Sequence, residues 1–134
     1  MKKRVLDVGN CGPDHAAIKQ LMGRFSAEVV QADGAADALA AIRAGGIDLV
    51  LVNRKLDMDY SDGIEVIRQI KADPEFAGTP VMLITNYPEH QDAAEQLGAL
   101  RGFGKLEYDK PETHERITAA FSQSKLPDLP ADAS

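Results

Sequence analysis

The sequence has almost no cysteine, few aromatic residues and no long apolar run. Its only cysteine among 134 residues is Cys11, and a single thiol cannot form a disulfide within the chain. This favours a reducing compartment and predicts a cytoplasmic protein. No apolar run approaches the ~20 residues that a membrane-spanning helix needs, so we expect no membrane partner. The basic start MKKRVLDVGN is not a signal peptide by this criterion, because Asp7 interrupts its short apolar run.

A basic surface is also missing. The chain carries 15 Lys and Arg against 21 Asp and Glu, which gives a net charge of −6, and its cations are scattered. Contacts to phosphates need a clustered basic face, so a nucleic-acid partner is excluded. With 44% hydrophobic and 27% charged residues, the composition is that of a globular protein long enough for one domain with a real core.

What the chain does contain is a regular alternation of short apolar runs and helical patterns. The segments AEVVQA, DLVLV and PVMLIT predict strands, and shorter runs around Val5 and Leu100 predict two more. Between them lie helical patterns, one preceded by Asp33 as the expected N-cap and one beginning near Gly63. We expect one domain over residues 1–123, followed by a disordered tail, 124–134, that contains two prolines.

Five strands alternating with five helices demand right-handed crossovers and a parallel sheet with helices on both faces. In such sheets the functional site lies outside the carboxyl ends of the strands. The polar or unusual residues at these predicted ends are Gly9, Asn10, Asn53, Thr85 and Lys105.

Several stretches around these positions resemble the receiver domain of two-component response regulators. ADGAADAL resembles the turn after the family's second strand, and IDLVLVN followed by DGIEVIRQIKADPEFAGTPVMLIT follows the family pattern through the fourth strand. GALRGFGK has the family's spacing from a Gly-Ala pair to its lysine. The resemblance covers about residues 3–121. It implies the α/β, flavodoxin-like (CheY-like) fold, a doubly wound five-stranded parallel sheet of order 2-1-3-4-5 with five helices.

The residues that carry the family's chemistry are replaced. A working receiver holds Mg²⁺ with two acidic residues after its first strand, where this chain has Gly9 and Asn10. It accepts a phosphoryl group on an aspartate that ends its third strand, where this chain has Asn53. An amide is not a nucleophile, and Mg²⁺ takes carboxylates from proteins. We therefore expect no metal, no cofactor and no phosphorylation here, although Thr85 and Lys105 fit the family pattern.

Other departures concern the segment around the lysine. Leu106 stands where the family has a proline in cis linkage, and Gly102 stands where it has a switching aromatic residue. The aromatic is instead at Phe103, and a shift of one residue along a strand turns a side chain to the opposite face. We therefore expect the Phe103 ring to pack inward. The loop after Asn53 is about two residues longer than in the family.

The resemblance and the substitutions together favour a binding module and not an enzyme. The chain is expected to be an atypical receiver, or pseudo-receiver, in two-component or phosphorelay-type signalling that acts by phosphorylation-independent protein–protein interaction. Its partner would be another signalling protein, whether a kinase, an output protein or a receiver. The surface that receivers generally use, formed by the fourth helix, fifth strand and fifth helix, would include Tyr87, Phe103, Lys105 and Tyr108.

Two other functions stay open at this point. Cys11 near a helix N-terminus suggests a small flavodoxin-like enzyme with thiol or phosphate chemistry, although no C-x-x-C motif accompanies it. Alternatively, a loop aspartate could be a relocated phosphoacceptor or metal ligand. The simpler interpretation is that Asp57, Asp59 and Asp62 are solvated turn formers, with Asp62 as a helix cap. A buried acid in the first strand would need a polar partner. The candidate compensating acids are Asp7, Asp57, Asp59 and Asp62.

Overall fold

Strands and helices alternate along residues 2–123, the part of the chain that the computed structural model describes. The expected tail, 124–134, lies outside the described residues. A short 3₁₀ helix, η1 (Lys105–Glu107), precedes the last helix and was not predicted. The elements in chain order are β1 (Lys3–Val8), α1 (Gly12–Gly23), β2 (Ala27–Ala32), α2 (Ala35–Ala44), β3 (Leu49–Asn53), α3 (Gly63–Ala72), β4 (Val81–Ile84), α4 (Pro88–Gln96), β5 (Leu100–Phe103) and α5 (Pro111–Gln123).

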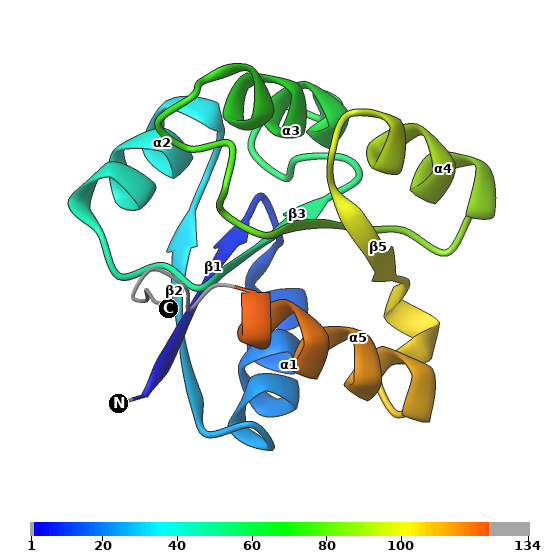
Figure 1. Ribbon diagram of the computed structural model, residues 1–134. Coiled ribbons are helices and arrows are strands. Elements are labelled where there is room, and N and C mark those ends of the chain that lie inside the picture. The colour runs from blue at the N-terminus through cyan, green and yellow to red at the C-terminus, as the bar shows by residue number, and fades with distance from the viewer. Residues whose placement is uncertain (1, 124–134) are drawn as a thin grey trace.

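The five strands form one parallel sheet in the order β2-β1-β3-β4-β5, which confirms the predicted fold class and topology. Helices α2, α3 and α4 lie on one face of the sheet, and α1 and α5 lie on the other (Figure 1). Within residues 2–123, no helix combines the length and the apolar character needed to cross a membrane.

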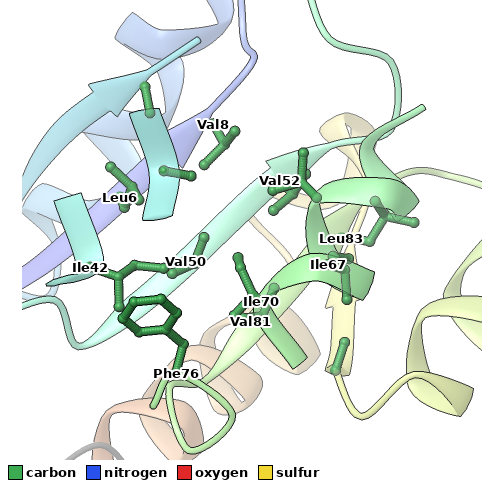
Figure 2. Packing of buried hydrophobic residues seen from close by; sticks show 14 of the residues in the cluster. Leu6, Val8, Ile42, Val50, Val52, Ile67, Ile70, Phe76, Val81 and Leu83 are labelled. Carbon is green, nitrogen blue, oxygen red and sulfur yellow. The ribbon is translucent and has the colours of Figure 1, made fainter. Parts of the chain in front are cut away.

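The central strand β3 shows why the sequence forms this sheet. Its four apolar residues are all fully buried, because a strand covered by helices on both faces needs apolar side chains on both. Val50 and Val52 join the core cluster under α2 and α3, whereas Leu49 and Leu51 join the cluster under α1 and α5. Figure 2 shows the first cluster, in which the ring of Phe76 lies beside Ile42.

The helix N-termini test two local predictions. Asp62 caps α3 as predicted, because its Oδ1 accepts a hydrogen bond from the Ile64 backbone N–H at 3.0 Å. The prediction of Asp33 as the cap of α2 was wrong by one residue, since the N-cap is Gly34. A Cβ at Gly34 would lie 3.1 Å from the Met58 methyl group, so the absence of a side chain lets Met58 lie against this turn.

The pairing of β4 with β5 contains an irregularity that decides where Phe103 points. Met82 pairs with Leu100 and Ile84 with Phe103, so β5 carries one extra residue between these two pairs. Gly102 lies in this bulge, where a Cβ would come within 2.3 Å of the Leu83 carbonyl oxygen. No aromatic ring fits at residue 102, and Phe103 is turned inward with 1% of its surface exposed, as predicted.

We expect Phe103→Ala to lower the free energy of unfolding by about 3–5 kcal/mol, because the deleted ring leaves a cavity in the cluster under α1 and α5. Tyr87→Ala is the matched control, since Tyr87 is exposed and its truncation should change stability by less than about 0.5 kcal/mol. Urea unfolding of both variants measures the difference. Equal losses for the two variants would show that Phe103 is not part of the core.

Candidate functional site

The buried carboxylate of Asp7 organises the carboxyl end of β1. It is fully buried on the sheet face that packs against α1, and both of its oxygens have partners. Asn10 Nδ2 donates to Asp7 Oδ1 at 2.5 Å, and His15 Nδ1 lies 2.6 Å from Oδ2. An ionised carboxylate only accepts hydrogen bonds, so His15 carries a proton on Nδ1. Asp7 thereby has the polar partners that burial requires.

A second acidic residue joins α1 to the loop after β5. Lys105 Nζ donates to Asp14 Oδ2 at 2.5 Å, and the Cys11 thiol donates to the same oxygen at 3.3 Å. The hydrogen bond from Lys105 holds the pKa of Asp14 below its ordinary value. Lys105 therefore has a carboxylate partner on α1, whereas the residue that ends β3 offers only an amide.

Tyr108, which directly follows η1, is the third residue of this region. Its hydroxyl oxygen is buried and has no hydrogen-bond partner among residues 2–123. Burial, followed by the nearby carboxylates of Asp14 and Asp7, raises the pKa of Tyr108 far above its ordinary value, so the phenol stays protonated. The ring packs edge-on against Phe103, with the centroids 5.8 Å apart.

The end of β1 is covered by the loop that follows β3. Gly9 has a φ of +80°, a backbone conformation that L side chains rarely adopt. A Cβ at this position would lie 2.3 Å from Leu56 Cδ2, and Leu56 is itself buried. The Asp57 backbone N–H donates to the Gly9 carbonyl at 2.9 Å, which holds the loop in place. An acidic side chain at residue 9 would therefore strain the backbone and would have to displace Leu56.

Asn53 uses its amide within its own loop. Its Nδ2 donates to the Lys55 carbonyl oxygen at 2.7 Å. The loop closes on itself through a bridge between Lys55 and Asp62 and through a 2.8 Å hydrogen bond from the Gly63 N–H to the Arg54 carbonyl. The side chain at residue 53 thus acts as a donor here, a role that a carboxylate cannot perform.

The three loop aspartates point outward. Asp59 accepts hydrogen bonds from the Ser61 hydroxyl and backbone N–H, and the hydroxyl is the main reason why the pKa of Asp59 is lowered. Asp62 caps α3 and lies 3.5 Å from Arg54, while Asp57 is exposed. In the described part of the chain, no three His, Cys, Asp or Glu side chains gather in a way that could hold a metal ion.

The fourth strand ends in a separate set of contacts. Thr85 Oγ1 lies 3.3 Å from His90 Nδ1 and accepts a hydrogen bond from the Tyr87 N–H at 3.3 Å. Buried Gln91 donates to the Leu83 carbonyl and accepts from the Gly102 N–H, which fixes α4 across β4 and β5. No hydrogen bond within residues 2–123 joins the Thr85 side chain to Asn53 or Lys105.

The predicted partner surface is only partly accessible. Tyr87 is 59% exposed, so it can contact a partner. Phe103 cannot, and its assignment to a partner surface was wrong, because the bulge in β5 turns its ring into the core. Tyr108 is half-buried with its hydroxyl directed inside.

Sequence analysis did not identify His15 and Asp14 as site residues. Helical spacing was the available signal for His15, because it lies one turn after Cys11 in α1, which packs against β1. The Asp14–Lys105 pair joins residues 91 positions apart, and no local pattern predicts it.

Two kinds of comparison with known proteins gave matches, one with a family model and one with solved structures. A family model described as the response regulator receiver domain matches residues 14–122. A putative response regulator from Chloroflexus aurantiacus superposes with a TM-score of 0.77 at 17% identity, over 91% of this chain and 99% of that one. The signal receiver domain of a histidine kinase from Syntrophus aciditrophicus gives 0.72 at 17% identity, over 98% and 99%.

One similar structure is considerably longer than this chain. NtrX from Brucella abortus superposes with a TM-score of 0.71 at 22% identity, over 92% of this chain but only 28% of NtrX. At such identities the structural matches support the fold, and they leave the chemistry of the strand ends to the contacts described above.

The pair of Asp7 and His15 gives a prediction that single variants alone cannot test. His15→Leu should lower the free energy of unfolding by about 1–3 kcal/mol, because it removes one of the two hydrogen-bond partners of a buried carboxylate. The double variant Asp7→Val/His15→Leu should be more stable than His15→Leu alone, since it removes the stranded charge as well. Urea unfolding at neutral pH measures this coupling, and strictly additive losses would contradict it.

Lys105→Met should raise the pKa of Asp14, because it removes the main cause of its depression. A carboxylate with a depressed pKa in the folded state contributes stability above its unfolded pKa of about 3.9, and this contribution disappears as the pH falls through the folded pKa. The unfolding free energies of wild type and Lys105→Met should therefore converge in acid. NMR titration of the Asp14 carboxyl measures the shift, with the exposed Lys110→Met as control. An unchanged Asp14 pKa in Lys105→Met would contradict the pairing.

Proposed function

We propose that this chain, which belongs to the response regulator receiver family, is a pseudo-receiver that signals by binding another protein and without aspartyl phosphorylation. Receiver domains are signalling modules, and this one would act in a two-component or phosphorelay-type pathway. The unit we propose is residues 1–123, and its partner would be a kinase, an output protein or another receiver. Its single cysteine supports a cytoplasmic location.

One observation carries the proposal: each position where the family has a carboxylate holds a residue whose contacts require a neutral group. A side chain at Gly9 would have to displace the buried Leu56. The Asn10 amide donates to the buried carboxylate of Asp7, and a second carboxylate at 2.5 Å would repel it. The Asn53 amide donates to a carbonyl oxygen, where a carboxylate would again face an acceptor.

These residues do not fit a magnesium ion. Mg²⁺ needs oxygen ligands in near-octahedral geometry and usually takes one or two carboxylates from the protein. Gly9, Asn10 and Asn53 supply none. The carboxylate of Asp7 is already engaged by Asn10 and His15, and that of Asp14 is paired with Lys105. Without a cation and a nucleophile, phosphoryl transfer to the end of β3 has neither charge neutralisation nor an acceptor.

The rival functions have less support from the contacts. The Cys11 thiol donates a hydrogen bond to the Asp14 carboxylate, and Nδ1 of His15 is already engaged with Asp7. No hydrogen bond in the described residues joins Cys11 to a histidine side chain. A relocated acceptor is equally unsupported. Asp59 and Asp62 are engaged in turn and cap contacts, and no His, Cys, Asp or Glu cluster that could hold a cation adjoins them within residues 2–123.

The partner surface we propose comprises α4, β5 and α5, with Tyr87 as its exposed aromatic residue. If binding is independent of phosphorylation, the Kd for a partner purified from the source organism will be the same with and without acetyl phosphate and Mg²⁺. Tyr87→Ala should weaken that complex, and Glu28→Ala on the exposed side of β2 should not. A phosphodonor-dependent Kd would overturn the proposal.

Wild type and Asn53→Asp should both remain unphosphorylated by acetyl phosphate with Mg²⁺, because the new carboxylate at residue 53 still lacks a cation. Intact-mass spectrometry and hydroxylamine sensitivity of any added phosphoryl group are the measurements. Efficient phosphorylation of Asn53→Asp would show that a single substitution silences the site and that our account of the metal is wrong.

Asn10→Asp should destabilise the protein at neutral pH, because two carboxylates then meet at the buried end of β1. The pKa of that carboxyl pair would lie above the ordinary range, so lowering the pH should relieve the destabilisation. Asp7→Asn/Asn10→Asp, which exchanges donor and acceptor, is the control and should be more stable than Asn10→Asp alone. A stable Asn10→Asp variant that binds Mg²⁺ would contradict the requirement for a neutral residue.

A further inference from the structure

Helix α4 is attached to the sheet by little apolar surface. It packs against β4 and β5 at one edge of the sheet (Figure 1). Its buried residues are Gln91 and Ala94, and the methyl group of an alanine contributes little hydrophobic stabilisation. Leu97, at the carboxyl end of α4, packs partly against the core. The amino-terminal half of the helix therefore depends on Gln91, which is 5% exposed although glutamine is mostly found at protein surfaces.

The Gln91 side chain uses both ends of its amide. Nε2 donates to the Leu83 carbonyl at 2.9 Å and to the Thr85 carbonyl at 3.4 Å, while Oε1 accepts the Gly102 N–H at 2.7 Å. The donor end meets the end of β4 and the acceptor end meets β5, so one side chain connects α4 to two strands. An amide can do this because it carries a donor and an acceptor, whereas a carboxylate only accepts and an apolar side chain does neither.

The bulge in β5 supplies the N–H that Gln91 binds. The extra residue that β5 carries relative to β4 interrupts the regular pairing at Gly102, which is buried. A buried backbone N–H without a partner is costly, and Gln91 is the partner here. The position where the family resemblance places a switching aromatic residue is thus an anchoring point for α4.

The first turn of α4 also places the exposed aromatic residue of the proposed partner surface. Thr85 Oγ1 accepts the Tyr87 N–H at 3.3 Å and lies 3.3 Å from His90 Nδ1. The ring of Tyr87 packs edge-on against His90, with the centroids 5.3 Å apart. Tyr87 is therefore positioned by the same turn of helix that Gln91 fastens to the sheet.

We propose that Gln91 is a positioning residue of the partner surface, which holds α4, and with it Tyr87, in one arrangement against β4 and β5 before any partner binds. This rests on the proposed function, because it describes how the surface assigned there is kept ready. A surface that is already ordered avoids the entropy loss of ordering it in the complex. Thr85, although it fits the family pattern, then serves α4 and not a phosphoryl group.

Hydrogen exchange of the free protein tests the anchoring. Gln91→Met keeps the length of the side chain and removes its hydrogen bonds, so the Gly102 N–H and the amides of residues 87–96 should exchange faster by roughly tenfold or more, the effect of leaving a buried group unsatisfied. Amides of β3 should keep their protection, which shows that the loss is local and that the variant is folded. Gln96→Met is the matched control, because Gln96 is an exposed glutamine of the same helix. It should leave all these rates unchanged.

Gln91→Glu separates the two ends of the amide at neutral pH. Its carboxylate can still accept the Gly102 N–H but cannot donate to the carbonyls of Leu83 and Thr85. The Gly102 amide should therefore stay protected while the amides of α4 exchange faster than in wild type. A residue that only filled space would not give this split, since glutamate and glutamine have nearly the same size.

Relaxation dispersion of backbone amides measures whether the surface is held in one arrangement. Residues 85–96 should show no exchange on the microsecond-to-millisecond timescale in wild type, and clear exchange in Gln91→Met. Exchange of α4 in the free wild type would overturn the positioning role, and so would a Gln91→Met variant that behaves like Gln96→Met.

These measurements are made without a phosphodonor, so they succeed or fail separately from the proposed function. Phosphorylation of the wild type by acetyl phosphate would refute the proposed function and would leave the exchange rates of Gln91→Met as they are.

Discussion

The hydrogen bonds of the buried Asp7 carboxylate constrain the entire end of β1. A charge placed in the sheet face under α1 is tolerable only when donors surround it, and here Asn10 and His15 are those donors. The amide at residue 10 therefore cannot be exchanged for a carboxylate without repulsion, and the imidazole at residue 15 must face the sheet. Asp7, the unusual charged residue of β1, thus also fixes the first turn of α1 through its contact with His15.

A second, steric constraint acts at the same end of β1, which the loop after β3 covers. The loop after β3 seats Leu56 over Gly9, whose positive φ and lack of a Cβ make this close approach feasible. The buried Leu56 and the glycine therefore depend on each other. An apolar side chain occupies the space beside residue 9, and the residues that follow Leu56 form an exposed turn that carries Met58 and Tyr60.

The fold could be predicted from the sequence because it depends on local patterns that repeat along the chain. The LVLV run of β3 identified a strand covered on both faces, and the alternation of elements fixed the parallel order. The inward turn of Phe103 followed from its one-residue offset. The contacts of the site were harder to predict. Asn10 could be recognised as a neutral replacement, but its bond to Asp7 depends on rotamers, and the Leu56–Gly9 contact depends on how two distant loops meet.

Lys105 shows why a matching family residue is weak support for a retained reaction. In a phosphorylated receiver the lysine at this position would face an anion at the end of β3, and here that strand ends in an amide. The ammonium instead binds Asp14, which joins the loop after β5 to the first turn of α1 across the face that covers Asp7. A partly buried pair of this kind stabilises that junction whatever happens at residue 53, because breaking it leaves a carboxylate beside the buried Tyr108 phenol and close to Asp7. The lysine therefore has a structural role that does not depend on phosphorylation, and its presence does not distinguish an active receiver from one that only binds.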